Sequence, residues 1–147
     1  MNFLKLIPGI MICALLSSCE TNTFLKSKKK LNSELQGYWS PAYGTSQYGT
    51  TANNNKVLWY FKDGEVFILR TDDTGNDVSI DNGHYSFQNK LDQDYLTIED
   101  LKSVEYNSMY GFNIKWNLID LGKNTLDIAG QPHNSGRIEI EFKKTEH

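Results

Sequence analysis

Apolar and polar side chains alternate along the C-terminal third of this 147-residue chain. The even-numbered residues from 110 to 118 and from 138 to 142 are all apolar. A period of two places the apolar side chains on one face of a strand. Beyond Leu31, no segment keeps a helical period for more than one turn, except a short piece over residues 31–36 that Gly37 would end. The pattern therefore predicts an all-β body with one buried face.

Eight segments carry strand signals, because they are rich in β-branched and aromatic residues and are separated by clusters of Gly, Asn and Asp. They are residues 37–41, 56–62, 65–70, 78–88, 93–99, 110–119, 124–129 and 136–143. Asp63-Gly64 is typical of a tight hairpin, and residues 89–92 and 122–124 join two further pairs. We expect these strands to bury their apolar face by closing into an eight-stranded antiparallel up-and-down barrel. A two-sheet sandwich is the alternative that periodicity leaves open.

Two irregularities stand out in the strand pattern. Residues 57–61 and 66–69 are apolar on both faces, so a helix, a loop or a partner should cover these strands from outside. In the fourth segment the apolar positions change from even to odd between Ile80 and Tyr85. We predict a one-residue bulge at Gly83, which restores the register, and a hairpin turn at Asn82-Gly83 is the alternative.

The N-terminus has the order of a secretory signal. Lys5 precedes an apolar run over residues 6–16, and the small residues Ser17 and Ser18 follow. The run is too short to cross a bilayer, which needs about 20 apolar residues. Residues 1–18 are therefore predicted to be removed from the mature protein.

The sequence Leu16-Ser17-Ser18-Cys19 resembles the lipobox of bacterial lipoproteins. The resemblance implies that Cys19 receives a diacylglyceryl group and becomes the mature N-terminus. Cys13 would leave with the signal, so neither a disulfide nor a free thiolate is expected in the mature chain. Several acyl chains hold a protein stably at a membrane. The expected location is the bacterial cell envelope, with the outer membrane favoured over the inner membrane.

Residues 19–30 read as a polar tether that ends in the lysine-rich stretch 26–30. We expect this tether to be solvated. Contact of its lysines with anionic lipid headgroups is the alternative, and both can be true. Residues 31–147 form the predicted barrel domain, which carries 10 Lys and Arg against 17 Asp and Glu, a net charge of −7. Nucleic-acid binding selects a basic surface, so a nucleic-acid partner is not expected.

Leu35-Gln36-Gly37-Tyr38-Trp39 resembles the L-x-G-x-W motif that opens the first strand of lipocalin-like proteins. Residues 59–64, 83–85, 96–98 and 138–143 also fit that family. The resemblance implies an eight-stranded barrel with a turn over one end, closed by Trp39 under a basic residue of the last strand. Arg137 or Lys143 could supply that basic residue. The chain departs from the family in having no disulfide and no evident C-terminal helix.

Large aromatic residues suggest two interpretations of the barrel interior. Those expected to face inward are Trp59, Phe67, Tyr85, Phe87, Phe112 and Trp116. They would either line a cavity for a small apolar ligand or fill a short barrel completely.

Residues 42–55 form a long connection rich in Tyr, Gly and Asn. Long loops are often functional, so Tyr43 and Tyr48 are candidates to cover the open end and contact a ligand or partner. A solvated loop is the alternative. The acidic stretch 72–77 lacks the spacing of a calcium-binding loop and is expected to be a solvated turn.

The chain offers little for catalysis. His84, His133 and His147 are far apart in sequence, and no zinc-ligand spacing, nucleophile elbow or phosphate-binding loop is present. We expect no catalytic residue, metal or cofactor, and no enzyme.

Together these patterns predict a lipid-anchored, lipocalin-like protein that binds or carries a small apolar or amphiphilic molecule. The alternative is an interaction protein of the envelope, such as an inhibitor or immunity protein, whose filled barrel presents loops to a protein or glycan.

Overall fold

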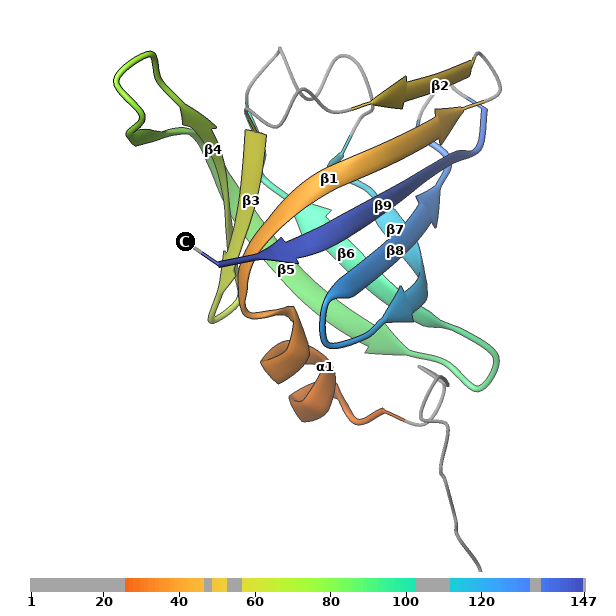
Figure 1. The fold of residues 1–147 in the computed structure, drawn as a ribbon. Coiled ribbons are helices and arrows are strands. Elements are labelled where there is room, and N and C mark those ends of the chain that lie inside the picture. The colour runs from red at the N-terminus through yellow and green to blue at the C-terminus, as the bar shows by residue number, and fades with distance from the viewer. Residues whose placement is uncertain (1–25, 47–48, 53–56, 103–111, 133–135, 147) are drawn as a thin grey trace, which may run out of the picture.

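The computed structural model describes residues 26–46, 49–52, 57–102, 112–132 and 136–146. One helix and nine strands lie in these ranges (Figure 1). They are α1 (Lys28–Leu35), β1 (Gly37–Ser46), β2 (Gly49–Ala52), β3 (Val57–Lys62), β4 (Glu65–Thr71), β5 (Asp77–Asn89), β6 (Asp94–Glu99), β7 (Lys115–Leu121), β8 (Thr125–Gly130) and β9 (Ile138–Thr145). The described part of the chain contains no helix with the length and apolar character of a membrane span.

Eight strands close into an antiparallel barrel. β1 pairs with β3, each later strand pairs with the next, and β9 returns to pair with β1 (Figure 1). The closing pair joins Tyr38 to Thr145 at one end and Ser46 to Ile138 at the other. The predicted barrel is thus confirmed, and the sandwich alternative is excluded.

The connection predicted over residues 42–55 is partly a strand. β1 continues to Ser46 because a register shift between Pro41 and Tyr43 lets the sheet continue past the proline, which has no N–H to donate. β2 then pairs with the end of β1, from Tyr43 opposite Ala52 to Ser46 opposite Gly49. The sequence signal for β2 is weak, because its four residues contain no large apolar side chain to face a core.

β5 is one continuous strand with a bulge, as predicted, but the bulge is not at Gly83. Ile68 pairs with Asp81 and Leu69 with Ser79, so Ile80 is the extra residue. Gly83 serves a different purpose, since a Cβ there would lie 2.3 Å from the backbone oxygen of Glu99. Glycine is therefore required at residue 83 by the close approach of a neighbouring backbone.

Helix α1 covers one end of the barrel. Ser27 caps it, because the Ser27 Oγ accepts a hydrogen bond of 3.3 Å from the Lys30 N–H. Leu31 and Leu35 are both fully buried, and each contributes about 2 kcal/mol on burial. The helix begins at Lys28, so part of the predicted tether belongs to the folded domain.

Lys26 also lies against the domain. Its ammonium donates to the Glu34 carboxylate at 2.7 Å and to the carbonyl of Leu121 at the end of β7. Residues 26–30 of the predicted tether thus lie against the barrel, although the side chains of Lys28, Lys29 and Lys30 are exposed to solvent as expected.

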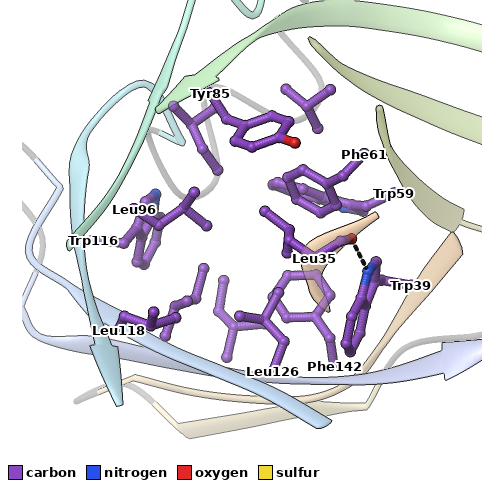
Figure 2. Close-up of a cluster of buried hydrophobic side chains, with 14 of the residues drawn as sticks. Leu35, Trp39, Trp59, Phe61, Tyr85, Leu96, Trp116, Leu118, Leu126 and Phe142 are labelled. Atoms are coloured by element: carbon purple, nitrogen blue, oxygen red, sulfur yellow. Dashed lines mark hydrogen bonds between the residues drawn. The ribbon is translucent and has the colours of Figure 1, made fainter. Parts of the chain in front are cut away.

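The core fills the barrel end that lies over α1. Figure 2 shows Leu35 surrounded by side chains from the strands. The largest side chains with less than 2% exposure are Trp39, Trp59, Trp116, Phe61, Phe142, Leu31, Leu35, Ile68, Leu96, Ile98, Leu118 and Leu121. The period of two is confirmed within β7 and β9, since Trp116, Leu118, Ile138, Ile140 and Phe142 are all buried. The strand predicted over residues 110–119 begins only at Lys115, and residues 110–111 lie outside the described residues.

Candidate functional site

Trp39 closes the α1 end of the barrel. Its indole Nε1 donates a hydrogen bond of 2.7 Å to the carbonyl oxygen of Leu35, and both residues are fully buried (Figure 2). This bond satisfies one of the carbonyls that the end of α1 leaves open. The Lys144 ammonium lies 5.0 Å from the centre of the Trp39 ring and donates to the carbonyl of Glu34 at 2.8 Å. Burial lowers the pKa of Lys144, and the nearby Glu34 carboxylate partly opposes that shift.

The basic residue over Trp39 is thus Lys144, and neither Arg137 nor Lys143 has that position. Arg137 lies just before β9, is exposed and pairs with Glu139 at 2.9 Å. Lys143 is exposed and pairs with Glu141. The register places Trp39 opposite Lys144. The sequence contained the signal for Lys144, because every second residue from 138 faces inward and residue 144 is the next after 142.

Three of the aromatic residues predicted to face inward pack against one another. Trp59 contacts Phe112 edge to face at 4.8 Å between ring centres, and Phe112 contacts Trp116 at 6.0 Å. The Trp116 Nε1 donates to the carbonyl of Phe112 at 3.1 Å. None of the three is more than 5% exposed. These residues therefore belong to the buried core of the described interior.

Phe67 does not face the interior. Its neighbours Val66 and Ile68 are fully buried, so Phe67 points outward from β4. There it lies 6.0 Å from Tyr60, which stacks on Tyr38 at 4.4 Å. The prediction of Phe67 as an interior residue is wrong, because both faces of this strand are apolar and the sequence alone did not say which face is inside.

Tyr85 and Phe87 face inward from β5 and also line a groove beside α1. The groove has a volume of about 410 Å³ and lies between α1, β5 and the turn that joins β3 to β4. Its lining residues are Lys28, Asn32, Gln36, Asp63, Gly64, Tyr85, Ser86 and Phe87. Pockets for small ligands usually measure about 300–1,000 Å³.

Gln36 holds the walls of this groove together. Its amide Nε2 donates to the Tyr85 hydroxyl at 2.8 Å, and its Oε1 accepts from the Asp63 N–H at 3.1 Å. Asp63 and Gly64 have φ of 49° and 90°, as a tight two-residue hairpin requires. The Tyr85 N–H donates to the Gly64 carbonyl at 2.8 Å. Burial raises the pKa of the Tyr85 hydroxyl, so this hydroxyl is neutral at physiological pH.

The groove combines apolar and polar groups. Tyr85 and Phe87 are its aromatic lining residues, and each is only 6% exposed. Lys28, Asn32 and Ser86 are exposed at its rim and supply an ammonium, an amide and a hydroxyl. Such a surface suits a small amphiphile whose apolar body contacts the rings while its polar head meets the rim.

The remaining polar groups that the sequence singled out are engaged locally. The Asp72 carboxylate accepts hydrogen bonds from Thr74 and Asn76, which lower its pKa and organise the acidic turn. His84 pairs with Asp100 at 3.2 Å, and both side chains are exposed. Among the described residues, no group of three or more His, Cys, Asp or Glu could hold a metal ion.

Several predicted positions lie outside the described residues, namely Cys19, Tyr48 and His133. Tyr43 belongs to β1, with its backbone opposite Ala52 and Glu141. The sequence interpretation missed the groove residues of α1, since it assigned Lys28 to a tether. Ser27 was the available signal, because serine is a preferred helix cap.

Two solved structures share this fold. One is a lipocalin-like protein from Bacteroides uniformis, with a TM-score of 0.54 and 17% sequence identity. The other is an uncharacterized protein from Bacteroides eggerthii, with a TM-score of 0.53 and 13% identity. Each match covers 76% of this chain and 99% of the other chain. No family model and no curated protein matches the chain. The fold is therefore lipocalin-like, and a shared fold alone does not identify a function.

Proposed function

We propose that this chain is a lipid-anchored, lipocalin-like lipoprotein of the bacterial envelope that binds a small amphiphilic molecule. The observation that carries ligand binding is the groove between α1 and β5, with aromatic rings beside an ammonium, an amide and a hydroxyl. The anchor rests on the lipobox-like sequence before Cys19. We place the protein at the outer membrane and assign it no catalytic activity and no cofactor.

The proposed binding site differs from the central cavity that the sequence suggested. Trp59, Phe112 and Trp116 are buried against one another inside the barrel, so a ligand that took their place would have to displace these aromatic rings. A ligand in the groove needs no such displacement. It would contact the Tyr85 and Phe87 rings from the side of α1.

A substitution that fills the groove tests this placement. Asn32 and Ser33 are exposed neighbours on α1, but only Asn32 lines the groove. Asn32→Trp places an indole in the groove, and Ser33→Trp adds the same indole to the solvated side of the helix as a matched control. Native mass spectrometry should detect an added lysophospholipid on the wild-type protein and on Ser33→Trp, with at least a tenfold loss on Asn32→Trp. Equal binding by both variants, or no binding to the wild type, contradicts the proposed site.

The anchor has its own test. Cys19→Ala removes the acceptor for the diacylglyceryl group and leaves the described core unchanged. We expect this variant in the soluble fraction of lysed cells, whereas the wild type stays with the membranes. An intact mass without acyl chains on wild-type Cys19 contradicts lipidation.

A second candidate function is supported by the outer face of the barrel. Tyr38, Tyr60 and Phe67 form an aromatic row across β1, β3 and β4, and each ring is partly exposed. Such a row on a filled barrel fits an envelope interaction protein that contacts a protein or glycan. Phe67→Ser tests this candidate, since it should abolish capture of that partner and leave lysophospholipid binding unchanged. Unchanged capture excludes the aromatic row as the contact surface.

A further inference from the structure

Helix α1 and three turns of the barrel lie at the same end of the molecule (Figure 1). The turn between β3 and β4 is tied to α1 through the bond from Asp63 to Gln36. The turns after β5 and β7 meet the residue that precedes the helix, because Asn89 donates to the Lys26 carbonyl at 3.4 Å and Lys26 donates to the Leu121 carbonyl. We call this surface the α1 end. It comprises α1 and residues 63–64, 90–93 and 122–124.

The α1 end is basic although the domain as a whole is acidic. Five exposed lysines lie on it, against two exposed carboxylates, Asp63 and Asp92. The lysines are Lys28, Lys29, Lys30, Lys90 and Lys123. The turn between β4 and β5 lies at the opposite end of β5 and contains Asp72 and Asp73 without any lysine or arginine. The turn between β4 and β5 is thus acidic, in contrast to the α1 end.

An isolated apolar side chain projects from the α1 end. Leu91 is 102% exposed at the tip of the turn between β5 and β6, where the neighbouring residue is Lys90. Val78 and Ile119, the other exposed large apolar residues among those described, keep about half of their surface covered, at 48% and 49%. An apolar tip with lysines beside it matches the interfacial region of a bilayer, where apolar groups leave water and cations meet anionic headgroups.

The covalent chain restricts which end can face the membrane. Lys26 begins the described residues and is seven residues after Cys19, so at most about 25 Å of chain separates them. Lys26 is held at the α1 end by its contacts with Glu34 and Leu121. With acyl chains on Cys19, the α1 end is the part of the domain that stays within reach of the headgroups.

We propose that the α1 end docks on anionic lipid headgroups, with Leu91 entering the interface and the five lysines around it contacting phosphates. The inference rests on the lipid anchoring proposed above and adds an orientation to it. Lys28, one of these five lysines, also lines the groove between α1 and β5, so the groove borders the proposed contact surface.

Site-specific labelling tests the orientation in the lipidated protein. In the mature chain the thiol of Cys19 is acylated, so Leu91→Cys introduces a single free thiol for a fluorescent probe. Asp73→Cys, on the exposed turn between β4 and β5, is the matched control. In vesicles of phosphatidylcholine and phosphatidylglycerol, the probe at residue 91 should be at least threefold less accessible to iodide than the probe at residue 73. Equal access at the two positions overturns the proposal.

Charge reversal tests the lipid contact without the anchor. The Cys19→Ala protein should bind the same anionic vesicles weakly, and added salt should reduce that binding. Lys29→Glu with Lys90→Glu should lower it at least tenfold, whereas Lys102→Glu with Arg137→Glu, outside the α1 end, should lower it less than threefold. Equal losses in the two variants would mean that net charge alone drives binding. That result overturns the proposal that the α1 end is the docking surface. Equal binding to pure phosphatidylcholine vesicles, or binding only to envelope protein or glycan, also overturns it.

These outcomes are separable from failure of the proposed function. An intact mass that lacks acyl chains on Cys19 removes the anchor, yet vesicle binding by the Cys19→Ala protein still reports on the α1 end. Loss of lysophospholipid binding in Asn32→Trp reports on the groove alone. Asn32 is uncharged, so that variant keeps all five lysines of the α1 end.

Discussion

Truncation of Lys144 should weaken the closure of the barrel, whereas truncation of Arg137 should not. Lys144→Ala removes the hydrogen bond of 2.8 Å to the Glu34 carbonyl and the cation that lies 5.0 Å from the Trp39 ring centre. A hydrogen bond from a charged donor contributes about 1.5–3 kcal/mol, and a partly exposed cation–π contact about 0.5–1 kcal/mol. Desolvation of the ammonium, which lowers the pKa of Lys144, offsets part of that gain. We expect a net loss of about 1–2 kcal/mol.

Arg137→Ala is the matched control, because Arg137 lies just before β9, the strand that contains Lys144. The Arg137 side chain is 58% exposed and its partner Glu139 is 56% exposed. Exposed ion pairs contribute about 0–1 kcal/mol, so the expected change is below about 0.5 kcal/mol. Urea unfolding of both variants in the Cys19→Ala background measures the difference. A loss for Arg137→Ala that equals or exceeds the loss for Lys144→Ala refutes the assignment of Lys144 as the closing residue.

Three further substitutions test the barrel. Gly83→Ala should destabilise the fold by about 3 kcal/mol or more, since its Cβ would lie 2.3 Å from the Glu99 backbone oxygen. A urea midpoint equal to that of the wild type would contradict this close approach. Leu35→Ala should lose about 2–5 kcal/mol, because it leaves a cavity in the core over α1, and a loss below about 1 kcal/mol would mean that the helix does not seal the barrel. Asp127→Asn should raise stability near neutral pH by less than about 1 kcal/mol. Burial is the main cause that raises the pKa of Asp127, and the negative charges of Glu141 and Asp120 add to it. The folded state therefore keeps the Asp127 proton to a higher pH than the unfolded chain does. Since the unfolded carboxyl titrates near 3.8, the folded state loses stability as pH rises above that value. The wild type and Asp127→Asn should converge in urea midpoint below about pH 4, and a constant difference across pH would contradict this cause.

The sequence predicted the parts of the fold that follow from local periodicity. The alternation in the last strands gave the buried set around Trp116 and Phe142 correctly, and Asp63-Gly64 gave a true hairpin. These features depend on neighbouring residues only. These strands then predicted a closed barrel, because a sheet with one apolar face and no helix to cover it can bury that face by closing on itself.

The errors share a physical cause, which is register between strands that are distant in sequence. The candidates Arg137 and Lys143 missed Lys144, because finding it required knowing which residue of β9 lies opposite Trp39. Gly83 was taken as a bulge because glycine often marks one, yet its role depends on the approach of Glu99. Phe67 lies in a strand that is apolar on both faces, so only the burial of its neighbours Val66 and Ile68 in the folded barrel shows that it points outward.

The candidate site was less predictable than the fold. The groove joins α1 to β5 and to the turn between β3 and β4, and its lining residues extend from Lys28 to Phe87 in the chain. Lys28 and Asn32 reach it because α1 packs across the barrel end through Leu31 and Leu35. The lysine-rich composition of the segment suggested a solvated tether and concealed the helix that Ser27 caps.

A crystal structure of the protein purified from its membrane together with its bound amphiphile tests ligand binding in the groove most directly. We expect density for the amphiphile between α1 and β5, with its apolar part against Tyr85 and Phe87 and its polar head near Lys28 and Asn32. Density inside the barrel among Trp59, Phe112 and Trp116, or an empty groove in crystals soaked with lysophospholipid, would contradict the proposed site.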